Sequence, residues 1–234
     1  MTQTSPGLVA PVPAPEFKSA VRRQTSLLAP LEQICLGWFA RKMPEWVKPD
    51  HLTLIGISAM LIAGVAYGVA RWWAPALLLV NLCLAINWFG DSLDGTLARA
   101  RNKQRPRYGF YVDHIIDAFG ILFVICGLAF SGYMSWLIAL AVLVVYFMIS
   151  IEVYLATYTI GTFRLSFYKV SPTELRILLA IGNIRVFLHP TVSVFGEGYL
   201  FFDVGAAIAI VLMATVLIVS ATRNTIALYR AERV

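Results

Sequence analysis

The longest stretch of the chain without Asp, Glu, Lys or Arg covers residues 118–151 and has the sequence AFGILFVICGLAFSGYMSWLIALAVLVVYFMISI. These 34 residues exceed what one helix needs to cross a bilayer core of about 30 Å, which is about 20 apolar residues. Ser131 and Gly132 interrupt the stretch near its middle, as expected of a turn. The stretch therefore predicts two membrane-spanning helices joined by a short connection.

Other parts of the chain are equally poor in charge. Three further stretches of 19 residues lack charged side chains, at 52–70, 72–90 and 204–222. Of the 234 residues, 59% are hydrophobic and 14% are charged, against about a quarter charged in an ordinary soluble domain. This composition predicts a polytopic membrane protein. It leaves no soluble basic domain for binding nucleic acid, despite the net charge of +6.

We expect an all-α integral membrane protein in which residues 51–222 form a catalytic domain of six transmembrane helices. The expected spans are about 52–70, 74–99, 109–130, 133–157, 173–192 and 203–222. The fifth span departs most from an apolar pattern, because Arg176 and Arg185 interrupt it. No alternating pattern along the chain predicts a strand.

The flanking segments are expected to lie outside the bilayer core. Residues 1–16 contain four prolines and no Lys or Arg, which predicts a disordered tail. Within the region 17–50, apolar residues such as Ile34 and Trp38 share one helical face. This favours an N-terminal interfacial amphipathic helix in the headgroup plane, and packing on the protein's own loops is the alternative. Residues 223–234 are expected to form a cytoplasmic tail.

Positive charge gathers on one side of the expected spans. Of the 19 Lys and Arg, six precede residue 52 and five lie within 99–107, whereas Arg71 falls on the opposite side. By the positive-inside rule, we expect both termini and the linker 100–108 to face the cytoplasm.

Four carboxylates lie inside the expected spans, with Asp91 and Asp94 near the end of the second and Asp113 and Asp117 at the start of the third. Spacings of three and four residues place each pair on one helical face. Each buried charge costs at least about 2.5–3.5 kcal/mol on insertion scales, so four together need a partner. Carboxylate oxygens select hard cations, and four of them balance two divalent ions, either Mg²⁺ or Mn²⁺.

Small residues accompany the carboxylates at fixed spacing and leave room for a flat or phosphorylated ligand. The motif is D-x2-D-G-x2-A-R-x9-G-x3-D-x3-D. Its fixed positions are Asp91, Asp94, Gly95, Ala98, Arg99, Gly109, Asp113 and Asp117. The motif resembles the signature of the CDP-alcohol phosphotransferase family, also called CDP-alcohol phosphatidyltransferases. Six spans after an interfacial helix are also similar to the architecture of that family.

The resemblance implies a transferase of phospholipid biosynthesis. Family members attack the phosphate distal to cytidine in a CDP-linked alcohol with an acceptor hydroxyl, and they release CMP. By this resemblance Asp91, Asp94 and Asp113 hold a dinuclear metal site, and Asp117 shares in it and acts as general base. The implied nucleotide or substrate contacts are Asp91, Gly95, Ala98, Arg99 and Gly109. The implied partners are the CDP-linked lipid or alcohol, the alcohol acceptor and membrane lipids.

The resemblance leaves two CDP-linked donors open. One donor is CDP-diacylglycerol, with a small polar alcohol or its phosphate as acceptor; the other is CDP-choline or CDP-ethanolamine, with diacylglycerol as acceptor. Arg164, Lys169 and Arg176 favour the first, because a phosphorylated acceptor needs bases. His114 beside Asp113, and the stretch from Glu152 to residue 162, look like the choline and ethanolamine branch. We favour the first and take Glu152, Arg164 and Arg176 as candidate acceptor residues.

Two readings outside this chemistry also remain. Intramembrane acids often mark an ion or proton pathway, so a coupled transporter or a purely structural ion is the alternative to an enzyme.

Gly64 and Gly68 predict close helix packing, either between two spans or across a homodimer. For His114, a role in helix packing is favoured over metal ligation.

Overall fold

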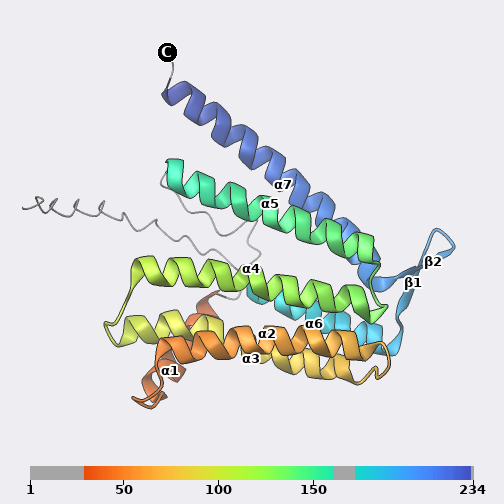
Figure 1. The fold of residues 1–234 in the computed structure, drawn as a ribbon, viewed down its shortest axis with the longest axis horizontal. Helices are drawn as coiled ribbons and strands as arrows, with labels where there is room; N and C mark the ends of the chain where they lie inside the picture. The colour runs from red at the N-terminus through yellow and green to blue at the C-terminus, as the bar shows by residue number, and fades with distance from the viewer. Residues whose placement is uncertain (1–28, 161–171, 233–234) are drawn as a thin grey trace, which may run out of the picture.

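The computed structural model of the chain describes residues 29–160 and 172–232. The expected tail 1–16 lies outside these residues. The elements, in chain order, are α1 (Ala29–Lys42), α2 (Pro49–Ala70), α3 (Ala76–Ala100), α4 (Pro106–Ser131), α5 (Trp136–Ile160), α6 (Pro172–Leu188), β1 (Thr191–Val194), β2 (Glu197–Leu200) and α7 (Phe201–Ala231) (Figure 1).

Within the described ranges, five helices are long and apolar enough to cross a membrane, namely α2, α3, α4, α5 and α7. This confirms the prediction of an all-α membrane protein with several spans. The expected fifth span corresponds to α6, which has 17 residues and carries Arg176 and Arg185. A total of six spans therefore stays a prediction.

Helix boundaries follow the sequence closely except at the C-terminal end. α4 ends at Ser131, and Gly132 adopts a φ of 79°. Many helices are closed by a glycine in this left-handed conformation, because it has no side chain to clash. The expected turn in the long apolar stretch is thus confirmed. α7 continues to Ala231, through most of the segment expected to be a tail.

A short antiparallel hairpin joins α6 to α7, so the expectation of no strands was wrong. β1 and β2 pair along all four residues of each strand. Phe195 and Gly196 form the turn with φ of 52° and 92°. Two successive residues with positive φ give a two-residue turn the twist that a hairpin favours. Strands this short are too brief for their alternation to stand out against an apolar background.

α2 is the central helix, because it packs on α3 along one side and on α4 along the other. A β-carbon added at Gly90 of α3 would lie 2.5 Å from the carbonyl oxygen of Leu52 in α2. Gly64 of α2 and Gly127 of α4 meet in the same way, each against the backbone of the opposite helix. The close packing expected at Gly64 is thus found inside the chain, whereas Gly68 has open space around its β-position.

α6 is fixed to α2 and α3 by a chain of buried polar side chains. The Tyr67 hydroxyl donates to Oδ1 of Asn183 at 2.7 Å, and Nδ2 of Asn183 donates to Oδ1 of Asn81 at 2.7 Å. Nδ2 of Asn81 in turn donates to the Ala180 carbonyl at 3.1 Å. Such hydrogen bonds help to hold helices together where apolar side chains gain little from contact.

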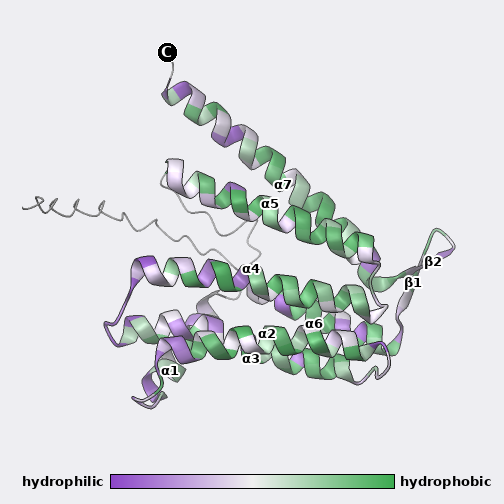
Figure 2. Ribbon diagram, in the orientation of Figure 1, coloured by the Kyte–Doolittle hydropathy of each residue, from purple (hydrophilic) through white to green (hydrophobic). Residues whose placement is uncertain are grey.

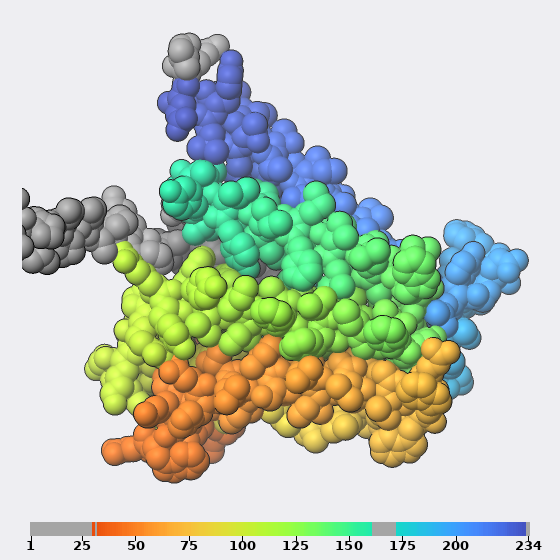
Figure 3. Space-filling view, viewed as in Figure 1, coloured from red at the N-terminus to blue at the C-terminus, as the bar shows by residue number. Residues whose placement is uncertain are grey.

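α5 and α7 form a pair beside α4 and are mostly exposed (Figure 3). Their middle portions are strongly hydrophobic (Figure 2). Oε1 of Glu152 in α5 accepts hydrogen bonds from Ser220 at 2.9 Å and from Asn224 at 2.6 Å, both in α7. The pair is therefore joined by a polar contact of its own.

α1 packs on α3 through a face made of Glu32, Leu36 and Ala40, all buried. Ile34 and Trp38 lie on the outer side, with 70% and 48% of their surface exposed. An exposed apolar edge suits lipid contact, so the interfacial position of α1 stays a prediction. The face that packs on the protein was not predicted.

Candidate active site

The carboxylates of the motif lie at the neighbouring ends of α3 and α4, on either side of the connection 101–105 (Figure 1). Pro106 begins α4, where the missing backbone N–H removes no helical hydrogen bond. The two helices run antiparallel (Figure 1). Each of them packs mainly on α2, and this leaves space between their acidic faces.

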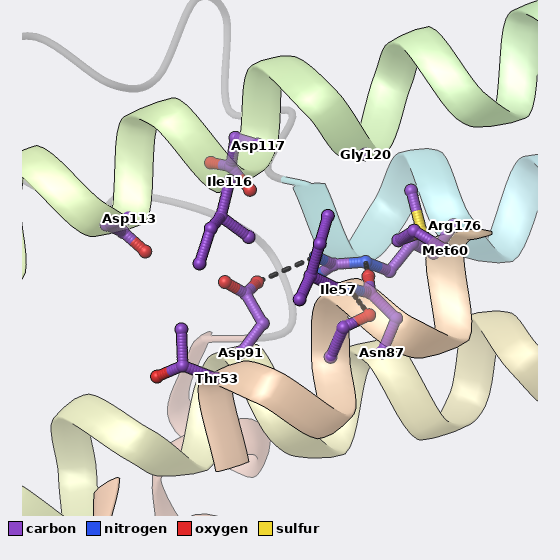
Figure 4. Close-up of a pocket in the computed structure, with 11 residues that line it drawn as sticks. Thr53, Ile57, Met60, Asn87, Asp91, Asp113, Ile116, Asp117, Gly120 and Arg176 are labelled. Carbon is purple, nitrogen blue, oxygen red and sulfur yellow. Dashed lines mark hydrogen bonds and ion pairs between the residues drawn. The ribbon is translucent and has the colours of Figure 1, made fainter. Parts of the chain in front are cut away.

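That space is a small open cavity between α2, α3, α4 and α6. Its lining residues are Thr53, Gly56, Ile57, Met60, Asn87, Asp91, Asp113, Ile116, Asp117, Gly120 and Arg176. Asp113 and Asp117 project from α4 toward the side of the cavity that carries Asp91 (Figure 4). Three of the four predicted carboxylates thus share one cavity.

Arg176 of α6 reaches into this cavity and pairs with Asp91. Nη2 of Arg176 lies 2.7 Å from Oδ2 of Asp91, and Nε donates to Oδ1 of Asn87 at 2.8 Å (Figure 4). The Arg176 side chain is 14% exposed and that of Asp91 is 25% exposed. A fixed guanidinium therefore faces the acidic residues.

Asp94 lies at the edge of the same region and is held by α2. Its Oδ2 accepts a hydrogen bond from the Thr53 hydroxyl at 2.5 Å. Its charge interacts with those of Asp91 and Asp113. Three carboxylates this close repel one another, and a bound cation would relieve that repulsion.

The donor set has the right chemistry for Mg²⁺ or Mn²⁺, since carboxylate, hydroxyl and amide oxygens converge on the cavity. In the part of the chain that the structure describes, no three acidic, histidine or cysteine side chains form a cluster tight enough for ligation. The oxygen atoms therefore lie around one cavity, but they would have to move closer together to coordinate an ion. The dinuclear site stays a prediction.

Thr53 and Asn87 were not among the site residues predicted from the sequence. Asn87 is 5% exposed, accepts from Arg176 and donates to the Gly56 carbonyl at 3.1 Å. It lies one helical turn before Asp91, and this spacing could have identified it as a site residue from the sequence. Thr53 belongs to another helix, so its place beside Asp94 depends on how α2 packs.

The small motif residues lie where a ligand has room to approach. A β-carbon at Gly109 would meet nothing within 4 Å, and one at Gly95 would meet only the Arg99 side chain at 3.4 Å. Arg99 is exposed, and its Nη2 donates to Thr96 at 3.0 Å. Ala98 is half-buried on the same helix. The expected contacts of these residues with a nucleotide stay predictions.

The basic linker is tied to the loop between α1 and α2. Arg101 donates to the backbone carbonyls of Met43 at 3.0 Å, Pro44 at 2.8 Å and Val47 at 2.5 Å. Arg105 forms an ion pair with Asp50 at the start of α2. These two bases therefore help to fix the end of the molecule at which the cavity lies.

The candidate acceptor residues are not all together. Arg176 lines the cavity, whereas Glu152 bonds to α7 and is not among the lining residues. Arg164 lies outside the described residues. The His114 ring contacts Phe110 and Tyr154, with centroids 4.2 and 5.2 Å apart, so it joins α4 to α5 as a packing residue would.

Comparison with known proteins gives a family and several relatives. The chain matches the CDP-alcohol phosphatidyltransferase family over residues 46–220. It is 30% identical over 104 residues to an archaetidylinositol phosphate synthase of Pyrococcus horikoshii, across 44% of this chain and 52% of that protein. It is 30% identical over 168 residues to cholinephosphotransferase 1 of Gallus gallus, across 67% of this chain and 48% of that protein. The corresponding human protein is 28% identical over 168 residues.

The chain spans about half the length of the curated relatives it matches. The family match, however, covers well over half of this chain and contains the whole motif from Asp91 to Asp117. It also contains the four helices that line the acidic cavity. The resemblance drawn from the motif is confirmed, and the chain belongs to the CDP-alcohol phosphatidyltransferase family.

Proposed function

We propose that the protein moves a phosphatidyl group from CDP-diacylglycerol to the hydroxyl of a small polar alcohol or alcohol phosphate and releases CMP. The observation that carries this proposal is the cavity in which Asp91, Asp113 and Asp117 face Arg176. Carboxylates supply the cation-binding and base chemistry, and the arginine supplies positive charge for an anionic acceptor.

The proposed reaction forms one bond and breaks one bond at the same phosphorus atom. The acceptor oxygen forms a bond to the phosphorus of the phosphatidyl group, and the bond from that phosphorus to the oxygen of the departing CMP breaks. The acceptor proton passes to the Asp117 carboxylate, which needs only hydrogen-bond reach to the hydroxyl. Gly95, Ala98, Arg99 and Gly109 border the nucleotide.

Asp91, Asp94, Asp113 and Asp117 would hold two Mg²⁺ or Mn²⁺ ions. Bound ions of this kind neutralise a pyrophosphate and stabilise the charge of a leaving nucleotide. Thr53 keeps Asp94 oriented through its hydroxyl. Asn87 and Asp91 keep the Arg176 guanidinium at the cavity, in place for the phosphate of an acceptor.

A second candidate is transfer of phosphocholine or phosphoethanolamine from its CDP derivative to diacylglycerol. The similarity to cholinephosphotransferases favours it, because it extends over 67% of this chain, against 44% for the archaeal synthase. The aromatic contact of His114 with Tyr154, beside Asp113, also suits a quaternary amine. Under this alternative the metal-binding carboxylates keep their roles.

The deciding experiment incubates the purified protein and Mg²⁺ with CDP-diacylglycerol, CDP-choline or CDP-ethanolamine, each against a panel of acceptors, and measures CMP. Turnover with CDP-diacylglycerol and a polar alcohol or its phosphate is expected. Turnover only with CDP-choline or CDP-ethanolamine plus diacylglycerol would establish the second candidate instead. If no donor gives CMP while the same protein moves ions or protons in vesicles, the transporter alternative holds.

A further inference from the structure

Glu32 of α1 is a buried carboxylate bonded to two other helices. It is 9% exposed. Its Oε1 accepts hydrogen bonds from Nε1 of Trp88 at 2.9 Å and from Oγ of Ser92 at 3.1 Å, both in α3. The same oxygen accepts from Oγ1 of Thr173 in α6 at 3.0 Å. One oxygen atom therefore joins α1, α3 and the beginning of α6.

The second carboxylate oxygen of Glu32 makes this arrangement costly. Oε2 is buried and accepts no hydrogen bond from the residues that the structure describes. A carboxylate left partly unsatisfied away from water lowers stability, whereas an apolar side chain would pack α1 on α3 without that penalty. Packing of α1 alone does not account for an acidic residue here, so its hydrogen bonds to specific partners are the feature to explain.

The partners of Glu32 lie next to the residues that hold Arg176. Trp88 and Ser92 directly follow Asn87 and Asp91 in the sequence of α3. On α6, Thr173 precedes Arg176 by three residues, which is about one helical turn. The first turn of α6 is thus fixed to one short segment of α3 from two sides, by Glu32 and by Arg176 itself.

Two further polar contacts between α6 and α3 lie farther along the helix, at Asn183 and Ala180. They fix the middle of α6, whereas the contacts of Thr173 and Arg176 lie at its beginning. We propose that Glu32 is a positioning residue for the acidic site. Its carboxylate fixes the first turn of α6 on α3 and thereby keeps the Arg176 guanidinium at Asp91.

The test measures amide hydrogen exchange along α6 in the full-length protein in lipid nanodiscs. Glu32→Ala and Thr173→Val each remove the link to α6. Both should raise exchange at residues 176–179 on the order of tenfold and leave residues 184–188 unchanged. Glu32→Gln keeps an accepting oxygen and should recover most of the protection. Thr173→Val keeps the proposal testable should Glu32→Ala fail to fold.

A graded variant and a matched control separate positioning from general docking of α1. Ser92→Ala removes one of the two α3 donors to Glu32 and should raise exchange at 176–179 less than Glu32→Ala does, because Trp88 still holds the carboxylate. Leu36→Ala loosens the apolar contact of α1 but keeps the carboxylate, so it should raise exchange in α1 alone. Unchanged exchange at 176–179 in both Glu32→Ala and Thr173→Val would overturn the proposal. An equal rise in Leu36→Ala would overturn it as well.

A kinetic measurement extends the test, and this arm rests on the function proposed for Arg176. Glu32→Ala should raise the KM for an alcohol phosphate and spare the KM for CDP-diacylglycerol. In an Arg176→Ala background, Glu32→Ala should add no further increase, because both changes remove the same contact. If exchange rises while the acceptor KM does not, Glu32 positions α6 as proposed and the acceptor role of Arg176 is wrong.

Discussion

The Asp91 carboxylate faces both a proposed cation site and the Arg176 guanidinium. Substitution of an acidic residue should therefore impair the cation site, whereas substitution of Arg176 should impair acceptor binding. Changing Asp91, Asp113 or Asp117 to Asn keeps the size of the side chain and removes one negative charge. CMP release should fall about a hundredfold or more, because cation binding and proton transfer both need the carboxylate. Thermal unfolding should change little for Asp113→Asn and Asp117→Asn, since helix packing elsewhere holds the fold. Asp91→Asn should lower the unfolding temperature as well, because it weakens the ion pair with Arg176.

Glu197→Gln is the control for these variants, because Glu197 is an exposed acid in the hairpin, at the opposite end of the helices from the cavity. It should keep near-normal activity. Near-normal CMP release by two of the three cavity variants would show that the site is assigned wrongly.

Arg176→Ala removes the cationic side chain that lines the cavity. For an anionic acceptor, KM should rise about tenfold to a hundredfold, as expected for the loss of a hydrogen bond to a charged group. The KM for CDP-diacylglycerol should stay close to its original value. Steady-state kinetics with each substrate varied in turn would measure both constants.

Arg185→Ala serves as the comparison, because Arg185 lies on the same helix but donates to the carbonyls of His189 and Thr191 at its far end. It should leave the acceptor KM unchanged. Equal effects of the two substitutions would mean that loss of charge on α6, rather than the place of Arg176, determines binding.

Individual site residues differed in how well the sequence revealed them. Asp91, Asp113 and Asp117 were predictable because helical spacing and membrane depth act on each residue locally. Asn87 and Thr53 were missed because a polar side chain in an apolar span has several ordinary explanations. Their contacts arise only when α2, α3 and α6 come together, which no local pattern encodes.

At the scale of helices, the approach of α2 to α3 depends on Gly90, one residue before Asp91. Gly90→Ala would force a β-carbon against the Leu52 carbonyl of α2. Overpacking of this kind costs about 1–3 kcal/mol, and the separation of α2 and α3 would also move Thr53 away from Asp94. We expect a lower unfolding temperature together with reduced CMP release.

Gly68→Ala is the matched substitution in an open position of α2. It should leave both quantities unchanged or slightly raise stability, since alanine favours helix. A similar loss in both variants would point to glycine flexibility rather than to backbone contact.

Elements with a long apolar pattern were predicted closely except at the C-terminal end of α7, whereas those with a mixed pattern were not. The ends of α4 followed from apolar length and from Gly132. For α1, the sequence indicated an apolar edge but not the buried Glu32 face, because a buried acid contradicts the ordinary hydrophobic pattern. The hairpin before α7 was missed since four-residue strands leave little periodic signal.

For the whole molecule, the charge distribution predicts that the cavity end faces the cytoplasm. In a background lacking the three native cysteines, Gln104→Cys in the linker should react with an impermeant maleimide only from the cytoplasmic side. Glu197→Cys in the hairpin, at the opposite end of the helices, should react only from the other side (Figure 1). Labelling of both cysteines from one side would contradict this topology.

The arrangement of the whole molecule was only partly predictable. Antiparallel α3 and α4 followed from the short linker, but the central place of α2 between them depends on the glycine contacts at Gly64 and Gly90. The pairing of α5 with α7 through Glu152 joins residues distant in sequence. Such long-range contacts need either a structure or many related sequences.

The two connections at opposite ends of the molecule differ in how firmly they are held. Residues 101–105 are bonded to the loop before α2 and to Asp50, so a longer linker would break contacts that fix the cavity end. The hairpin turn at Phe195 and Gly196 is exposed, and a β-carbon at Gly196 would meet nothing within 4 Å. A rigid fusion partner for electron cryo-microscopy, or an epitope tag, therefore belongs between Phe195 and Gly196, where it would leave the catalytic end intact.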